Sequence, residues 1–272
     1  MTGGRGATGP PSTRTVVITG AAGGIGAALA RRYARDGARV ALLDRDAEGA
    51  AAVAADLGDD VARAWGCDVT SAADCQAAVA GVVSAWGGVD ILVNNAGITH
   101  LGAFADTEVE VIRNVMEVNL FGAVNCTKAA LPWLLDRRGQ IVVLSSVAGV
   151  APLAGRTGYA ASKHALHGFF DSLRSEHRHE GLRVLIVCPS FVDTPIGDNA
   201  LGPTGGPAPT EARTGVRTPM PPEVVADAIV GARRGRRLLL VPREARLALW
   251  TARLVPRLYE RLMLRRTGGT GA

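Results

Sequence analysis

The stretch from residue 145 to residue 163 holds side chains that could move a proton at an alcohol or a carbonyl group. Tyr159 and Lys163 are four residues apart, which places them on one face of a helix. An ammonium close to a phenol favours the phenolate and lowers the tyrosine pKa, so the phenol can serve as a general acid or base. Ser145 and Ser146 follow an apolar run, residues 141–144, and a hydroxyl there could hydrogen-bond the oxygen whose proton moves. The same tyrosine–lysine spacing also occurs between surface neighbours on a helix, so the surrounding elements must decide.

A glycine-rich turn lies near the start of the chain, between a β-branched run at residues 15–18 and a helical segment at residues 27–35. Small residues in such a turn let a pyrophosphate reach backbone N–H groups at the positive end of the helix dipole. The pattern therefore predicts an anion site for a dinucleotide. The residues assigned to it are Gly20, Gly24, Ile25 and Gly26.

The next apolar run, residues 40–43, ends at Asp44, which is 18 positions beyond Gly26. A carboxylate at this distance can accept hydrogen bonds from an adenosine ribose and repels a 2′-phosphate, so it favours NAD over NADP. Arg45 works in the opposite direction, because a basic residue there can accommodate that phosphate. Alternatively, Asp44 is a cap for the helix that begins at Asp46.

The chain as a whole alternates apolar runs with helical segments, which predicts an α/β fold with one doubly wound, Rossmann-type parallel sheet flanked by helices. Helices are expected at residues 71–86 and 107–131, the second opened by a capping box at residues 107–110. Ligands bind such sheets at the carboxyl ends of the strands, and each motif falls at such an end. Besides the two runs above, strands are expected at residues 61–67, 89–93, 141–144, 183–187 and 238–241.

Composition limits the class of protein. The chain of 272 residues is 47% hydrophobic and 20% charged, which is typical of a globular domain. No Cys-x-x-Cys pair occurs, so we expect reduced, buried thiols in a cytoplasmic protein, and the histidines suggest no metal site. Neither a signal peptide nor a membrane-spanning run of 18 apolar residues is evident. We expect a flexible leader at residues 1–13, a catalytic domain at 14–242 and a basic helical extension at 243–272.

Taken in order, these motifs resemble the short-chain dehydrogenase/reductase (SDR) family over roughly residues 14–241. The resemblance implies an NAD(P)-dependent oxidoreductase. In that family the catalytic serine lies 13 positions before the tyrosine, which selects Ser146 over Ser145. The residues that carry the resemblance are the glycine turn, Asp68, Asn94, Asn95, Ala96, Gly97, Asn119, Ser146, Tyr159 and Lys163.

The resemblance also implies a role for each of these residues. Tyr159 is the acid/base, Ser146 orients the substrate oxygen, and Lys163 lowers the tyrosine pKa and holds the nicotinamide ribose. Asn119 anchors a water in the proton relay. Alternatively, Asn119 has a purely structural role, as an asparagine inside a helix that bonds a neighbouring carbonyl. The implied cofactor contacts are Asp68 and Val69 at the adenine, Asn94, Asn95, Ala96 and Gly97 along the cleft, and Pro189, Val192 and Thr194 near the nicotinamide.

The chain departs from the family pattern after the sixth strand, where Pro189 is followed by Ser190 in place of glycine. Serine tolerates positive φ poorly, so we expect a different backbone at this turn. Residues 195–222, rich in Gly, Pro and Thr, correspond to a substrate lid that is mobile when empty. Since this region varies most within the family, the substrate is not readable from it.

The C-terminal segment is the second departure. Leucines gather on one side and arginines that step by four on another, and Pro256 is expected to divide the segment into two short helices. Packing on the sheet or on a partner subunit, contact with a membrane surface, and a nucleic-acid patch all fit this pattern. We favour packing, keep the membrane surface as an alternative, and expect no nucleic-acid partner. The leucines are Leu247, Leu254, Leu258 and Leu262, and the arginines are Arg253, Arg257, Arg261 and Arg265.

The function expected from these observations is NAD(H)-preferring interconversion of a small secondary alcohol and a ketone. One alternative is a membrane-surface enzyme acting on lipid-like or steroid-like substrates. Another is a non-catalytic nucleotide-binding sensor, against which the complete set of four catalytic-type residues argues. The family resemblance also implies a homodimer or homotetramer.

Overall fold

The computed structural model describes residues 13–209, 219–242 and 245–266. Most of the expected leader, the lid residues 210–218, and residues 243–244 and 267–272 of the extension lie outside this part of the chain.

A single sheet of seven parallel strands forms the centre of the fold, in the order β3-β2-β1-β4-β5-β6-β7. β1 lies between β2 and β4, with Val17 opposite both Ala41 and Leu92. The reversal of strand order beside β1 is characteristic of a doubly wound sheet, so the predicted fold class is confirmed. The strands are β1 (Thr15–Thr19), β2 (Arg39–Asp44), β3 (Ala62–Gly66), β4 (Ile91–Asn94), β5 (Gln140–Leu144), β6 (Arg183–Pro189) and β7 (Leu238–Val241).

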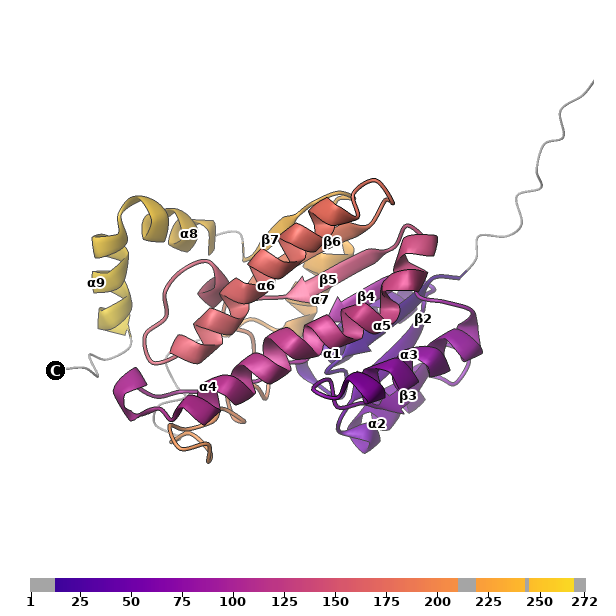
Figure 1. Cartoon of the computed structure of the whole chain (residues 1–272), viewed down its shortest axis with the longest axis horizontal. Helices are drawn as coiled ribbons and strands as arrows, with labels where there is room; N and C mark the ends of the chain where they lie inside the picture. Colours follow the sequence, from indigo (N-terminus) through magenta and orange to yellow (C-terminus); the bar gives the residue numbers. More distant parts are fainter. Residues whose placement is uncertain (1–12, 210–218, 243–244, 267–272) are drawn as a thin grey trace, which may run out of the picture.

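Helices cover both faces of the sheet, because neighbouring strand residues point to opposite sides. Val16 and Ile18 of β1 belong to a core shared with Leu29 of α1 and Ile229 of α7. The other core, on the face seen in Figure 1, lies under α3, α5 and α6 and includes Phe170. The helices on the two faces are α1 (Gly24–Arg35), α2 (Ala47–Leu57), α3 (Ala72–Trp86), α4 (Val109–Met116), α5 (Gly122–Asp136), α6 (Thr157–Glu176) and α7 (Pro222–Val230).

The predicted capping box at residues 107–110 is wrong. The Thr107 hydroxyl donates to the carbonyl of Ala103 at 2.7 Å, and α4 begins after Glu108 without a side-chain cap. The long helix expected from there is also interrupted, since a π-helical turn (Glu117–Phe121) separates α4 from α5. π-Helical turns inside α-helices occur often at functional sites.

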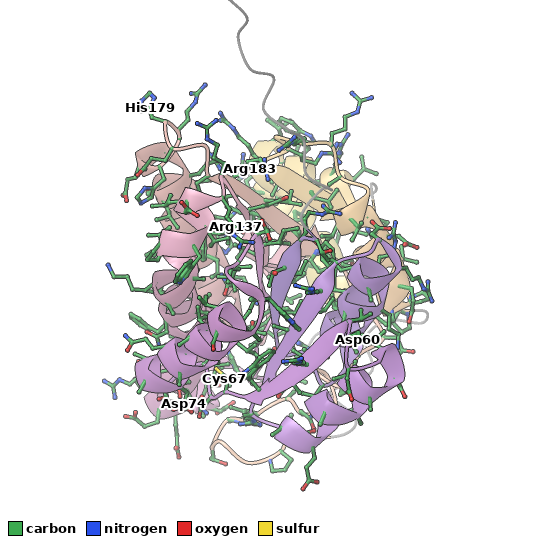
Figure 2. All side chains as sticks on the ribbon, turned by 90° about the vertical axis from the view of Figure 1, so that its right-hand side faces the viewer. Asp60, Cys67, Asp74, Arg137, His179 and Arg183 are labelled. Atoms are coloured by element: carbon green, nitrogen blue, oxygen red, sulfur yellow. The ribbon has the colours of Figure 1, made fainter. Side chains whose placement is uncertain are left out.

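The parallel strands bring all the motif-bearing loops to one end of the sheet. Figure 2 shows Cys67 and Asp74 at the end where β3 finishes, and Arg137, Arg183 and His179 at the opposite end. The glycine turn, the loop after β4 and the two serines after β5 follow strand ends on the Cys67 side. The catalytic and cofactor residues named from the sequence therefore share one edge of the sheet.

The C-terminal helices α8 (Ala245–Leu254) and α9 (Pro256–Arg266) lie beside the sheet, beyond the start of α6 (Figure 1). The break between them falls at Pro256, as predicted, because proline cannot continue a preceding helix. Across the described parts of the chain, no helix combines the length and the apolar character needed to cross a bilayer.

Candidate active site

The glycine-rich turn joins β1 to α1 in backbone conformations that suit glycine. Gly20 and Gly24 have positive φ angles of 64° and 53°. A Cβ atom on Gly26 would lie 2.1 Å from the carbonyl oxygen of Gly20, so a larger residue would force the turn apart. No side chain caps the start of α1 at Gly23, and the first turn of α1 has no acidic residue. These features fit a pyrophosphate held by the first amides of the helix.

Thr19 and Asn95 fasten this turn to the end of β4. The Asn95 amide nitrogen donates to the carbonyls of Thr19 and Gly20, both at 2.9 Å. The Thr19 hydroxyl accepts from the backbone amides of Asn95 and Ala96, both at 3.0 Å. Ile25 packs against the core from the α1 side. Asn95, Ala96 and Ile25 thus hold the shape of the predicted cofactor turn.

Asp44 connects the end of β2 to the same turn. Its carboxylate accepts from the backbone amides of Ala22 at 2.9 Å and Asp46 at 3.0 Å. The helix-cap alternative for Asp44 is wrong, because α2 is capped by Asp46, which accepts from the amide of Gly49 at 3.0 Å. The Asp44 carboxylate therefore stands beside the turn, at the position predicted to meet the adenosine ribose.

Asp68 follows the end of β3, and Arg45 follows Asp44 at the end of β2. The Asp68 carboxylate accepts from the amide and hydroxyl of Thr70, at 2.9 and 2.8 Å. These bonds, and then the charge of Arg45, hold the pKa of Asp68 below its usual value. The charge of Arg45 thus acts on the Asp68 carboxylate. Val69 is buried, and its carbonyl accepts from the Asn125 amide at 3.0 Å.

The loop after β4 meets the residues predicted to be catalytic. A Cβ atom on Gly97 would lie 3.0 Å from the Asn119 amide oxygen and 3.5 Å from the Lys163 nitrogen. The side chain of Asn94, in contrast, is buried and donates to the Thr127 hydroxyl on α5 at 2.9 Å. The Asn94 side chain is thus directed to α5 and the place of Asn94 along the cofactor cleft stays a prediction, whereas Gly97 lies beside Asn119 and Lys163.

The two adjacent serines point in different directions. The Ser145 hydroxyl is buried, donates to the Lys163 carbonyl at 3.2 Å and lies 3.0 Å from Nε2 of His167. The Ser146 hydroxyl accepts from the Ala148 amide at 3.1 Å, and its side chain lies close enough to the Tyr159 phenol to lower the pKa of that phenol. Ser146, chosen from its spacing to the tyrosine, is thus the serine that the fold brings to the phenol.

Tyr159 and Lys163 lie on the first turns of α6, beside the end of β5. The Lys163 nitrogen is 5.6 Å from the centre of the Tyr159 ring and donates to the Leu144 carbonyl at 2.8 Å. Burial lowers the pKa of Lys163 to about 8. Burial likewise raises the pKa of Tyr159, against the lowering effects of the Ser146 hydrogen bond and of the Arg156 charge. The predicted lowering of the tyrosine pKa by Lys163 does not appear in this arrangement.

Asn119 sits in the π-helical turn and is buried. Its amide oxygen accepts from the Ile98 amide at 2.8 Å, and its amide nitrogen donates to the Ile98 carbonyl at 3.0 Å and the Ser162 hydroxyl at 2.9 Å. These contacts match the interior asparagine considered as the alternative. Asn119 thereby joins the loop after β4 to α6, while its part in a proton relay stays a prediction.

The turn after β6 completes this edge of the site. Pro189 ends the strand, and the Ser190 amide donates to the Val241 carbonyl at 2.7 Å. Ser190 does not have a positive φ, in line with the expectation that serine would avoid this conformation at the turn. Val192 forms a bridge with Met220, and the methyl carbon of Thr194 would lie 3.1 Å from a Cβ atom on Gly24. Thr194 therefore faces the glycine turn.

The described part of the predicted lid is tied to the loop after β4. Leu201 exchanges backbone hydrogen bonds with this loop, accepting from the Leu101 amide at 2.8 Å and donating to the Thr99 carbonyl at 2.9 Å. This contact joins the segment predicted to be the lid to the loop that contains Gly97. Its expected mobility remains a prediction.

Two residues of the site were missed in the sequence. Arg156, three positions before Tyr159, is half-buried, donates to the Thr99 hydroxyl at 3.0 Å and acts by its charge on the phenol. His100 is buried and accepts from the Gly158 amide at 2.9 Å, which holds the start of α6. Arg156 carries a signal that the sequence did offer, since it lies one turn before the tyrosine.

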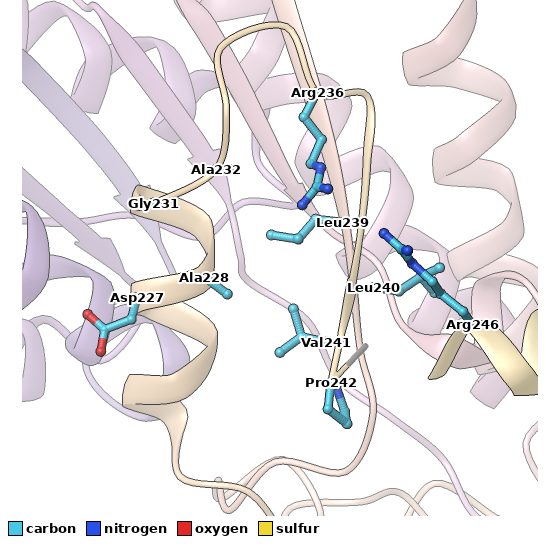
Figure 3. Close-up of a pocket in the computed structure, with 10 residues that line it drawn as sticks. All are labelled: Asp227, Ala228, Gly231, Ala232, Arg236, Leu239, Leu240, Val241, Pro242 and Arg246. Carbon is cyan, nitrogen blue, oxygen red and sulfur yellow. The ribbon is translucent and has the colours of Figure 1, made fainter. Parts of the chain in front are cut away.

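A pocket of about 310 Å³ lies apart from this site, between α7 and β7. Figure 3 shows Arg236 and Arg246 at its edges and Asp227 directed away from β7, toward the Arg32 that it binds at 2.8 Å. None of its lining residues belongs to the predicted catalytic or cofactor sets. Within the described residues, no cluster of metal-ligating side chains is found, and the four cysteines, Cys67, Cys75, Cys126 and Cys188, are buried and unbridged.

Comparison with known proteins agrees with this architecture. The family model for short chain dehydrogenase matches residues 14–202. Dehydrogenase/reductase SDR family member 7B of Bos taurus is 36% identical over 263 residues, covering 92% of this chain and 80% of that protein.

Solved structures resemble the whole fold. A short-chain dehydrogenase from Streptomyces avermitilis superposes with a TM-score of 0.78 at 29% identity, covering 96% of this chain and all of the other. A short chain dehydrogenase/reductase from Burkholderia phymatum in complex with NAD has a TM-score of 0.78 at 27% identity, covering 92% of this chain and 95% of the other. The chain belongs to the short-chain dehydrogenase/reductase family and is an NAD(P)-dependent oxidoreductase.

Proposed function

We propose that this protein interconverts a secondary alcohol and a ketone, with Tyr159 as the acid/base and NAD(H) as the preferred cofactor. The observation that carries the proposal is the meeting of Ser146, Tyr159 and Lys163 beside Gly97, at the same edge of the sheet as the glycine turn. When bound, the nicotinamide ring accepts hydride from the alcohol or donates it to the ketone.

Tyr159 holds the proton that the substrate oxygen loses or gains. In alcohol oxidation the phenolate takes the hydroxyl proton as the carbonyl forms, and in ketone reduction the phenol returns it. Ser146 lies beside the phenol, so a substrate oxygen held by both hydroxyls would be oriented for this transfer. Burial raises the pKa of the half-buried Tyr159 and so disfavours the phenolate.

Lys163 and Asn119 help to position Tyr159 and Ser146. The Lys163 ammonium donates one hydrogen bond to the Leu144 carbonyl and lies near the Gly97 backbone. Its remaining N–H groups could donate hydrogen bonds to a ribose hydroxyl of the cofactor there. Asn119 fixes the loop after β4 against α6 through Ile98 and Ser162. The position of the loop after β4 relative to Tyr159 on α6 thus depends on the hydrogen bonds of the Asn119 side chain.

NAD(H) preference is proposed from the position of Asp44. Its carboxylate binds the glycine turn through Ala22 and presents negative charge where a 2′-phosphate would lie. Arg45, the residue that could neutralise this phosphate, is exposed and close to Asp68. We expect the repulsion of a 2′-phosphate by Asp44 to outweigh its attraction by Arg45, so that the unphosphorylated ribose of NAD(H) binds more tightly.

The cofactor proposal is tested by titrating the protein with NADH and with NADPH, following energy transfer from tryptophan to nicotinamide. Tighter binding of NADH is expected, and Asp44→Ala should narrow the ratio of the two dissociation constants. Asp46→Ala is the matched control, because Asp46 caps α2 and does not bond the glycine turn. Equal ratios in Asp44→Ala and the unchanged protein would remove Asp44 from cofactor selection.

The catalytic proposal is tested by comparing Ser146→Ala with Ser145→Ala in turnover of a panel of secondary alcohols and ketones. The two serines are adjacent, but Ser146 acts on the phenol, whereas the Ser145 hydroxyl donates to the Lys163 carbonyl. Loss of at least about tenfold in kcat is expected for Ser146→Ala, with unchanged NADH affinity. An equal loss in both variants would argue that the serines act only through packing.

A further inference from the structure

The helix α8 exposes apolar side chains on the side opposite to the one that it buries. Ala245 and Leu249, four residues apart, are its buried residues. Leu247, Trp250 and Leu254 lie on the other side, following the i, i+3, i+7 spacing of one helix face. Their exposed fractions are 70%, 56% and 71%. A helix that only packs on its own domain would carry polar residues there, so this second apolar face calls for a partner outside the chain.

The apolar surface continues onto α9, and the orientation of α9 is fixed. Tyr259 donates its hydroxyl to the Pro152 carbonyl at 3.0 Å, and the sulfur of Met263 accepts from the Ala154 amide at 3.3 Å. These two side chains hold one side of α9 on the loop that leads to Tyr159. Leu258 and Leu262, one turn apart, remain exposed.

The same two helices are strongly basic. Four arginines, Arg246, Arg253, Arg257 and Arg261, are exposed, and Glu260 is the single acidic residue in the described part of this segment. Arg236, exposed at the edge of the pocket in Figure 3, adds positive charge near the start of α8. A partner for this surface must therefore be apolar at its centre and negatively charged around it.

We propose that α8 and α9 bind the surface of an anionic lipid bilayer. Leucine and tryptophan side chains enter the boundary between headgroups and acyl chains, and arginines attract the acidic headgroups, each by about 1 kcal/mol. A second copy of this chain fits less well, because the same arginines would face one another. A nucleic acid would use the arginines and could stack a base on the tryptophan, but it would leave the leucines exposed.

The placement has a consequence for the site. α9 rests on residues 152–154, within the loop between Ser146 and Tyr159. A bilayer bound to α8 and α9 would therefore lie close to this loop. The lipid-binding proposal itself does not depend on the proposed reaction.

The test is co-sedimentation of the full chain with vesicles of phosphatidylcholine alone and of phosphatidylcholine mixed with phosphatidylglycerol. We expect pelleting with the anionic vesicles and weakening by salt, because screening reduces the attraction of the arginines. The double variant Leu247→Gln and Leu254→Gln should lower the partition coefficient by at least about tenfold. Val224→Gln, which changes an exposed apolar residue of α7, is the matched control and should leave binding unchanged.

Two further measurements test whether the arginines and Trp250 of α8 and α9 contact the bilayer. Arg253→Gln with Arg257→Gln should lower the preference for anionic vesicles by about fivefold per arginine, whereas Arg178→Gln, an exposed arginine beyond α6, should not. The tryptophan emission of the unchanged protein should shift to shorter wavelength on vesicle binding, and Trp250→Phe should lose that shift while still pelleting.

Three results would overturn the proposal. The first is absence of pelleting with anionic vesicles, and the second is equal pelleting of the Leu247/Leu254 double variant. The third is an oligomer, detected by sedimentation velocity, that the same double variant dissociates, since the apolar face would then be covered by a second copy.

Discussion

The ammonium nitrogen of Lys163 lies 5.6 Å from the centre of the Tyr159 ring, yet its hydrogen bond goes to the carbonyl of Leu144. The two residues share a helix face, as their spacing predicts. Lys163, however, is buried and Tyr159 is half-buried, and burial disfavours the charged form of both groups. Lys163 therefore holds its place through β5, and the groups that lower the tyrosine pKa are Ser146 and Arg156.

The burial of Lys163 predicts a pH-dependent stability. Its pKa falls from 10.5 in the unfolded chain to about 8 in the folded one. Below about pH 8 both states are protonated, and the folded protein bears the full cost of the buried charge. As the pH rises from there toward 10.5, the unfolded state binds more protons, so the free energy of unfolding increases, by about 3 kcal/mol at most from this group.

Urea unfolding of the unchanged protein and of Lys163→Met across this pH range measures the effect. The difference between their unfolding free energies should move in favour of the unchanged protein as the pH rises. Parallel curves would mean that Lys163 does not change its pKa on folding.

Arg156 is predicted to tune Tyr159 by its charge. Removing the charge in Arg156→Gln should raise the tyrosine pKa further, since Arg156 opposes the effect of burial. In the direction of alcohol oxidation, which requires the phenolate, the pH at which kcat/KM reaches half its plateau should move upward. Arg156→Lys should keep the profile near its original position. A uniform fall of the rate without a shift would assign Arg156 a role in packing alone.

The glycine turn offers a matched pair for testing the cofactor site. A Cβ atom on Gly26 would lie 2.1 Å from the Gly20 carbonyl oxygen, whereas one on Gly23 meets no atom within 4 Å. Gly26→Ala should therefore displace the turn, lower NADH affinity by at least about tenfold and destabilise the fold by about 1–3 kcal/mol. Gly23→Ala, with an extended backbone, should do neither. Calorimetric titration with NADH and thermal unfolding of both variants provide the measurements, and equal behaviour would contradict the close-packed turn.

The sheet was predictable because most strands contain an uninterrupted apolar run, as expected for parallel strands covered on both faces, while the edge strand β3 is interrupted by Arg63. The helix break at Pro256 followed from local chemistry in the same way. The capping box failed because Thr107 found a nearer partner in the Ala103 carbonyl. The π-helical turn at residues 117–121 has no comparable local signal, since it contains neither a proline nor a side-chain cap that would mark a break in the helix.

The candidate site shows the same limit. Ser146 was selected through the family resemblance, from its spacing of 13 positions to Tyr159, and its catalytic role stays a prediction. The bonds of Asp44, Asn94 and Asn119 depend on residues that are distant in the sequence, and their partners could not be foreseen from spacing. The pKa of Tyr159 was misjudged for a related reason: a charge pair is visible in a sequence, but the burial that outweighs it belongs to the folded chain.

The most direct test of the account is Tyr159→Phe, which removes a single hydroxyl from the centre of the site. NADH affinity, measured by titration, should stay within about twofold of the unchanged protein, since the glycine turn is untouched. Turnover of secondary alcohols and ketones should fall by about 10²-fold or more, because no other described side chain is placed to exchange the substrate proton. Retention of near-normal turnover in this variant would contradict proton transfer by Tyr159, and with it the proposed reaction.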